Sequence, residues 1–169
     1  MMRFALAALA AMSLSACQST RGPIPAQATF DAREAAFIHK RGEGQIEGQA
    51  FIVLPNGQTR LAAGEAVRLV PSTAYSRARI AHLYGDRKFV RARDIPETPA
   101  HPDYVAHTRS TVSTSSGRFR FEGVAPGDYF VVTQKIYRQE GGLLPEGGAM
   151  YETVRVSGRE TARVVVVGR

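Results

Sequence analysis

The alternation of phenylalanine with arginine over Arg118–Phe121 places the strongest constraint on how this chain can fold. A period of two indicates a strand with one face buried and the other in water. Pro126-Gly127 follows, and the alternation resumes over Tyr129–Thr133. Proline and then glycine suit the two central positions of a type II turn, because glycine accepts the positive φ of the second position. The stretch Thr111–Val132 therefore predicts two antiparallel strands folded back across a tight turn, with Tyr129 buried behind it.

Further strands are expected wherever period-two or continuously apolar runs lie between turn signals. These runs are Gln45–Leu54, Gln58–Leu61, Ala66–Val70, Met150–Val156 and Thr161–Val167. The last two predict a hairpin around Ser157-Gly158, and the apolar run Val164–Val167 predicts a strand buried on both faces. The chain is therefore predicted to be mainly β, a Greek-key, immunoglobulin-like sandwich of about seven strands.

One or two peripheral helices are expected beside the strands. Thr29–Gly42 has acidic residues early and basic residues late, which matches the helix macrodipole. Ser72 can cap a second helix that ends at Tyr84, with Gly85 closing it. This helix begins an insertion over residues 72–109, where Arg87–Arg91 is either a strand or a loop. Three prolines make a regular element improbable over Asp94–His107.

The central stretch also resembles a known family. Eight residues carry its pattern: Thr114, Gly117, Phe119, Phe121, Val124, Pro126, Gly127 and Tyr129. The pattern is similar to that of the carboxypeptidase regulatory-like domain, a transthyretin-like β-sandwich. The segments Gly44–Phe51 and Gly64–Leu69 fit its earlier strands. The resemblance implies the fold and almost nothing about function, because sandwiches of this type have many unrelated roles.

The first residues predict export. Met1–Ala16 has a positive start and a short apolar run, as a signal peptide does, and the run is too short to span a bilayer as a helix. Leu14-Ser15-Ala16-Cys17 resembles a bacterial lipobox, which implies a lipid on Cys17, the sole cysteine. The alternative is an ordinary secretory signal. We therefore expect a signal peptide over 1–16, a flexible tether over 17–28 and one sandwich domain over 29–169. The resemblance implies a location in the bacterial cell envelope, more specifically the outer membrane facing the periplasm.

The net charge of +7 suits an anionic partner in the envelope, such as lipid, lipopolysaccharide or an acidic wall polymer. No nucleic-acid-binding pattern is present in the sequence. The basic residues of the insertion form a candidate partner surface: Arg77, Arg79, Arg87, Lys88, Arg91 and Arg93. The alternative is an ordinary solvated face on which some of the arginines pair locally.

Enzyme motifs are missing from the sequence. It has no Gly-x-Ser-x-Gly elbow, no His-Glu-x-x-His and no phosphate-binding loop. His101 and His107 have a spacing seen in zinc fingers but lack the cysteine pair. We therefore predict a non-catalytic envelope module, without a cofactor or metal, that binds a protein, glycan or lipid through the insertion. One alternative is a small hydrolase or metal-dependent enzyme using His101, Asp103 and His107. Another is a structural spacer without a ligand site.

Overall fold

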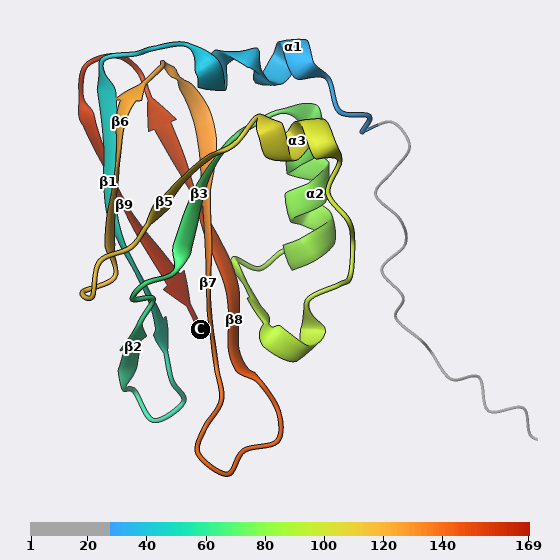
Figure 1. The fold of residues 1–169 in the computed structure, drawn as a ribbon, viewed down its shortest axis with the longest axis vertical. Coiled ribbons are helices and arrows are strands. Elements are labelled where there is room, and N and C mark those ends of the chain that lie inside the picture. Colours follow the sequence, from blue (N-terminus) through green and yellow to red (C-terminus); the bar gives the residue numbers. More distant parts are fainter. Residues whose placement is uncertain (1–27) are drawn as a thin grey trace, which may run out of the picture.

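Two β-sheets lie face to face in the computed structural model, which describes residues 28–169 (Figure 1). The predicted mainly β sandwich is confirmed, with nine strands in this part of the chain instead of about seven. The strands are β1 Gly44–Val53, β2 Thr59–Leu61, β3 Ala66–Pro71, β4 Phe89–Arg91, β5 Arg109–Val112, β6 Arg118–Val124, β7 Gly127–Tyr137, β8 Glu146–Val156 and β9 Thr161–Gly168. The helices are α1 Ala32–Ala35, α2 Ala74–Tyr84 and α3 Pro102–Ala106, with 3-10 helices η1 Ala36–His39 and η2 Ala92–Asp94.

The four-stranded sheet is built around β1. Strand β9 pairs with it in parallel from Gln45 to Ile52 and so occupies one edge. The opposite edge is shared by β6, antiparallel to Gly44–Gln49, and β2, antiparallel to Phe51–Val53. The five-stranded sheet is antiparallel, in the order β4-β8-β7-β3-β5.

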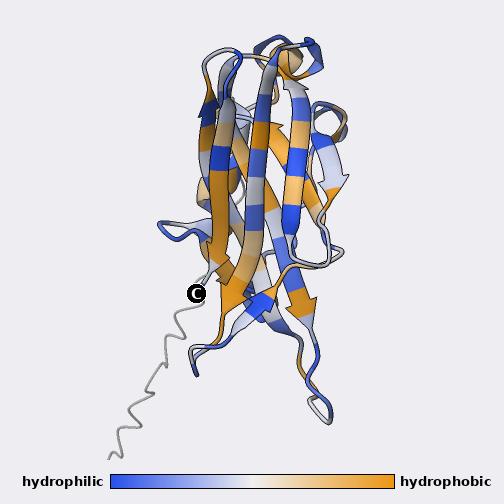
Figure 2. Ribbon diagram, turned by 90° about the vertical axis from the view of Figure 1, so that its left-hand side faces the viewer, coloured by the Kyte–Doolittle hydropathy of each residue, from blue (hydrophilic) through white to orange (hydrophobic). Residues whose placement is uncertain are grey.

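The main core lies between the two sheets. Figure 2 shows hydrophobic and hydrophilic bands alternating along the strands, as expected where only one face of a strand is buried. Phe119 and Phe121 are 5% and 3% exposed, so the burial predicted from their alternation is confirmed. The apolar run in β9 also alternates, because Val164 and Val166 are buried while Val165 is 53% exposed. The prediction that this run is buried on both faces is therefore wrong.

The predicted hairpin across Pro126-Gly127 is also wrong. Strand β6 pairs with β1 in the four-stranded sheet, whereas β7 pairs with β3 and β8 in the five-stranded sheet. Pro126 therefore lies where the chain crosses from one sheet to the other. The hairpin predicted around Ser157-Gly158 is wrong for the same reason: it is a second crossing between the sheets, because β9 leaves β8 to pair with β1. At each crossing, two strands that are consecutive in the sequence lie in opposite sheets, so their apolar side chains face each other across the core.

The corner at Pro126-Gly127 is not a type II turn. Gly127 has a φ of 159°, close to extended, whereas the type II turn needs about +80°. Glycine is needed here for space, because a Cβ would lie 2.6 Å from Cε2 of Phe37. The ring of Phe37 packs on that of Tyr129, with 5.3 Å between centroids. Tyr129 is 1% exposed and its hydroxyl donates a hydrogen bond to the carbonyl oxygen of Ala125 at 2.7 Å. Burial raises the pKa of Tyr129 to about 12.

The helix predicted over Thr29–Gly42 is shorter in the structure. Helix α1 begins after Asp31, which caps it, and passes into η1, which ends at His39. Ile38 is 4% exposed in the main core beside the partly buried Phe37. The tighter 3-10 turn therefore places the side chains of Phe37 and Ile38 on the end of the sandwich, in place of the longer amphipathic helix that was predicted.

The helices of the insertion over residues 72–109 form a third layer on the outer face of the five-stranded sheet (Figure 1). Between them, Phe89–Arg91 is a strand, β4, which pairs with β8 at the edge of that sheet. Helix α2 begins with a capping box between Thr73 and Ser76, one residue later than the predicted cap at Ser72. Ile80 and Tyr84 pack in a second apolar cluster that includes Phe130 of β7. Both faces of the five-stranded sheet are thus covered.

The segment Asp94–His107, predicted to lack regular structure, contains the five-residue helix α3. Pro102 stands at its N-terminal end, where its missing N–H costs no hydrogen bond and its fixed φ suits the first helical turn. The predicted signal peptide and tether lie outside the described residues, except for Ala28 at the tether's end. In residues 28–169, every helix is too short or too polar to cross a bilayer.

Candidate functional site

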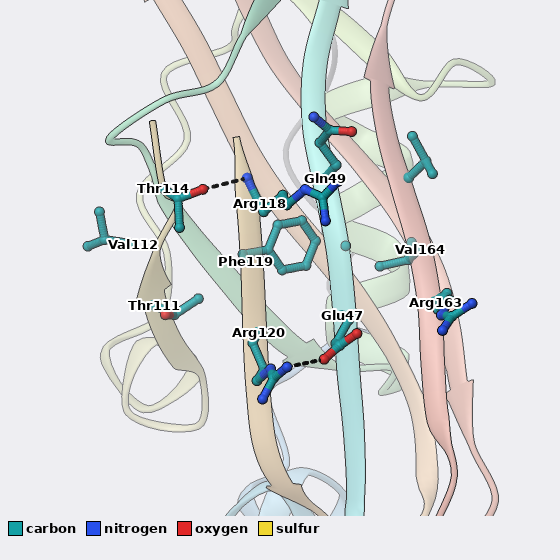
Figure 3. Close-up of a pocket in the computed structure, with 12 residues that line it drawn as sticks. Glu47, Gln49, Thr111, Val112, Thr114, Arg118, Phe119, Arg120, Arg163 and Val164 are labelled. Carbon is teal, nitrogen blue, oxygen red and sulfur yellow. Dashed lines mark hydrogen bonds and ion pairs between the residues drawn. The ribbon is translucent and has the colours of Figure 1, made fainter. Parts of the chain in front are cut away.

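The outer face of the four-stranded sheet is the large sheet face that the insertion leaves open. It consists of the outward positions of β1, β6 and β9, whose inward neighbours fill the main core. A groove of about 770 Å³ lies on this face and reaches β5, the edge strand of the other sheet (Figure 3). Its lining residues are Glu47, Gly48, Gln49, Thr111, Val112, Thr114, Arg118, Phe119, Arg120, Arg163, Val164 and Val165. We call this the sheet groove.

Strand register arranges the polar side chains of the sheet groove in two rows. In one row, Glu47 of β1 lies between Arg120 of β6 and Arg163 of β9. In the next row on the same face, Gln49 lies between Arg118 and Val165. Because all six positions are on paired strands, their backbone positions are fixed before any ligand arrives.

The arginines of the sheet groove differ in how they are paired. Arg120 forms ion pairs with Glu47 and, at 3.3 Å, with Glu122. In the described part of the chain, no hydrogen bond or ion pair occupies the guanidinium of Arg118 or that of Arg163. The guanidinium groups of Arg118 and Arg163 are therefore free to bind a ligand.

Neutral polar groups complete the sheet groove. The side-chain amide of Gln49 donates to the carbonyl oxygen of Ser116 at 2.8 Å, which fixes its orientation. The hydroxyl of Thr114 accepts a hydrogen bond from the backbone N–H of Arg118 at 3.1 Å, drawn as a dashed line in Figure 3. Thr111 adds a second hydroxyl from β5. The groove thus offers guanidinium, amide and hydroxyl groups on one face.

The six basic residues predicted as a partner surface do not act as one set. Arg77 pairs with Glu34 at 3.8 Å, and Arg93 with Asp94 at 3.8 Å. Lys88 pairs with Glu152 across the edge of the five-stranded sheet. The guanidinium of Arg79 donates to the carbonyl oxygens of Thr98 and Pro99 at 2.9 and 3.3 Å. These four side chains are therefore engaged in contacts of their own, and those of Arg77 and Lys88 join the insertion to α1 and β8.

The other two, Arg87 and Arg91, lie in a second hollow of about 640 Å³ together with Arg169. Its other lining residues are Tyr84, Phe89, Val90, Asp94 and Pro96. Two of the six predicted residues, Arg87 and Arg91, therefore line a basic hollow. Its third arginine, Arg169, directly follows β9.

His101, Asp103 and His107 lie close together but serve helix α3. The Nδ1 of His101 accepts a hydrogen bond from the N–H of Asp103 at 3.2 Å, and His107 donates from Nδ1 to the carbonyl oxygen of Asp103 at 2.7 Å. Both rings pack on Phe30, with centroids 5.6 and 5.3 Å away. Among residues 28–169, no three histidine, cysteine or acidic side chains are grouped so that they could hold a metal ion. Neither hollow described above is lined by the two histidines.

Sequence reasoning missed the residues of the sheet groove as a site. The alternation over Arg118–Phe121 was enough to place Arg118 and Arg120 on an outer face. The pairing of β6 with β1, and of β1 with β9, was needed to bring Arg163 beside them.

Comparisons with known proteins support the fold and give one functional hint. No protein-family model matches the chain, and no curated protein matches it. The crystal structure of a candidate carbohydrate-binding protein from Pseudomonas aeruginosa is similar with a TM-score of 0.70 and 26% identity, over 82% of this chain and 97% of that protein.

Two other solved structures resemble the chain less closely. A minor pilin of Streptococcus agalactiae has a TM-score of 0.39 and 18% identity, over 76% of this chain and 44% of the pilin. A lipoxygenase from Cyanothece has a TM-score of 0.29 and 9% identity, over 76% of this chain and 17% of the enzyme. At these scores neither structure carries an argument about function.

Proposed function

We propose that this protein is a non-catalytic, lipid-anchored module of the bacterial cell envelope that binds carbohydrate in the sheet groove. The observation that carries the proposal is the open groove itself, with two unpaired arginines on a rigid sheet. The insertion, by contrast, uses most of its basic side chains for local contacts. The binding site is therefore proposed on the opposite side of the sandwich from the insertion.

The chemistry of the sheet groove suits sugar hydroxyl groups. Each hydroxyl can donate and accept a hydrogen bond, so a carbohydrate needs both kinds of partner. Arg118 and Arg163 supply donors only, whereas Gln49, Thr111 and Thr114 supply donors and acceptors. A solvent-open groove on a sheet face also suits a chain-like ligand better than a small molecule, which is usually held in an enclosed cavity.

The likeness to the Pseudomonas aeruginosa protein supports the same class of ligand, because it extends over 97% of that protein. The residues that resemble a carboxypeptidase regulatory-like domain include Phe119, Phe121 and Tyr129 of the main core. As part of the proposal, we assign the domain to the carboxypeptidase regulatory-like type. This assignment concerns its architecture only, and the choice of ligand rests on the groove.

Carbohydrate binding can be tested with the full chain and a panel of envelope polysaccharides and their oligosaccharides, using isothermal titration calorimetry. We expect saturable binding to at least one of them. Gln49→Ala should weaken it roughly tenfold, because the side-chain amide that would bond a sugar hydroxyl is lost. The matched control is Gln134→Ala, an exposed glutamine on β7 of the other sheet. If Gln49→Ala binds as the wild type does, the groove is not the site. If no carbohydrate binds, the structural spacer becomes the better interpretation.

Anchoring can be tested separately through Cys17, which lies outside the described residues. Several acyl chains on one residue bind a membrane stably, since each buried methylene contributes about 0.8 kcal/mol. Cys17→Ser should therefore move the protein from the membrane fraction to the soluble fraction, or leave it unprocessed. Ser19→Ala in the tether is the control and should remain with membranes. A processed Cys17→Ser protein that still sediments with membranes would rule out the lipid anchor.

A further inference from the structure

We infer that the sheet groove selects acidic polysaccharides, with Arg118 and Arg163 each pairing with a carboxylate on the glycan. The inference rests on the proposed carbohydrate function and adds the class of sugar. It also names the two side chains that would read it.

The charges of the groove are unbalanced in favour of an anion. Arg118, Arg120 and Arg163 line it, and Glu47 is its single acidic lining residue. Arg120 is already neutralised by Glu47 within the groove and by Glu122 beside it. A neutral glycan would leave the charges of the other two arginines uncompensated. An acidic glycan would pair both, and charge-assisted hydrogen bonds are stronger than neutral ones.

The distance between Arg118 and Arg163 requires that they bind two separate carboxylates of the ligand. Arg118 and Arg163 lie on opposite sides of β1 and two residues apart in register, at diagonal positions. Strand spacing and rise put their Cα atoms roughly 12 Å apart. A ligand that meets both with separate carboxylates must be extended and carry repeated charges, as an acidic polysaccharide does. Figure 3 shows Arg118 extending from β6 toward Gln49 on β1, so this cation lies over the middle strand of the groove.

Apolar surface beside the arginines favours a sugar over a compact inorganic anion. Val165 and Val112 are 53% and 65% exposed and line the same groove. The C–H face of a sugar ring can cover such side chains, which removes apolar area from water. The guanidinium group also binds carboxylates in a planar, two-bond geometry that an ammonium group lacks.

The test compares polygalacturonate with the same polymer after its carboxyl groups have been reduced to alcohols. Affinities of the full chain are measured at low and moderate salt. We expect tight, salt-sensitive binding to the acidic polymer and weak binding to the reduced one. Arg118→Gln and Arg163→Gln should each weaken binding to the acidic polymer roughly tenfold, and the double variant should weaken it further. Binding to the reduced polymer should weaken much less, because glutamine keeps a hydrogen-bond donor for a sugar hydroxyl and loses only the charge.

Arg138→Gln is the matched control, because this exposed arginine lies beyond the end of β7, outside the groove. It separates a groove effect from the general attraction of a basic protein for a polyanion. Arg87→Gln tests the second hollow in the same way. Equal losses in the groove variants and in either of these would overturn the inference.

The outcomes also separate the inference from the proposed function. Equal affinity for the acidic and reduced polymers would overturn the selection of acidic glycans and leave carbohydrate binding intact. If the protein binds neither of these polymers and no polysaccharide of the panel, the proposed carbohydrate binding and the selection of acidic glycans are both overturned.

Discussion

Replacing Phe121 by alanine is expected to lower the free energy of unfolding by about 3–5 kcal/mol. The side chain is 3% exposed in the main core, and its ring lies 6.2 Å from that of Phe119 between centroids. Alanine would leave a cavity between two sheets whose backbones are held by strand pairing, so the site cannot easily collapse. Domains of this size have total stabilities of about 5–15 kcal/mol, so the loss is a large share.

Urea unfolding followed by circular dichroism measures this effect. Val112→Ala serves as the control, because Val112 is 65% exposed on β5 and its truncation should cost less than about 0.5 kcal/mol. A change below about 1 kcal/mol for Phe121→Ala would show that the ring does not fill the core. The same result would remove the basis for placing Arg118 and Arg120 on the outer face.

Much of the fold could be predicted because alternation reports burial directly. The pattern over Arg118–Phe121 correctly placed the two phenylalanine rings inside. It could not say which strand β6 pairs with, because the same alternation suits a hairpin and a crossing between sheets. Pro126-Gly127 looked like a type II turn on composition alone. The contact of Gly127 with Phe37, which explains the glycine, joins residues 90 positions apart in the sequence.

The candidate site was harder to predict for a related reason. The candidate binding face of this sandwich is the sheet face that no other element covers. Which face that is depends on the sheet against which the insertion packs. Ile80 and Tyr84 form an apolar stripe that predicts a buried helix face without naming the sheet beneath it. Once α2 covers the five-stranded sheet, the polar face of the other sheet is left open. The basic residues of the insertion lie close together in the sequence, which suggested one binding surface. In the folded protein most of them contact other side chains or carbonyl oxygens, as Arg77 contacts Glu34.

The second large effect is expected at Gly48, where the close approach of three strands leaves no room for a side chain. Gly48 of β1 lies in register with Phe119 of β6 on one side and Val164 of β9 on the other. A Cβ at this position would lie 2.4 Å from Cζ of Phe119 and 2.4 Å from the carbonyl oxygen of Val164. The absence of a side chain lets the phenylalanine ring lie over β1 and fill the core there.

Gly48→Val is therefore expected to lower the free energy of unfolding by about 3 kcal/mol or more, at the upper end of the cost of overpacking. The same urea unfolding experiment measures it. Gly158→Ala is the control, because its Cβ would have only the Glu160 carboxylate as a neighbour, at 3.7 Å. Its effect should stay within about 0.5 kcal/mol.

Gly48→Ala in combination with Phe119→Leu gives a second test, which applies even where Gly48→Val does not fold well enough to measure. Leucine removes the ring atom that meets the new Cβ, but the carbonyl oxygen of Val164 belongs to the backbone and stays. The double variant should therefore recover part of the stability lost in Gly48→Ala after allowing for Phe119→Leu alone, as a double-mutant cycle measures. Strict additivity of the two changes would show that the ring does not lie over Gly48. Full recovery would show that β9 can move away from β1, so that the four-stranded sheet is less rigid than a preformed groove requires.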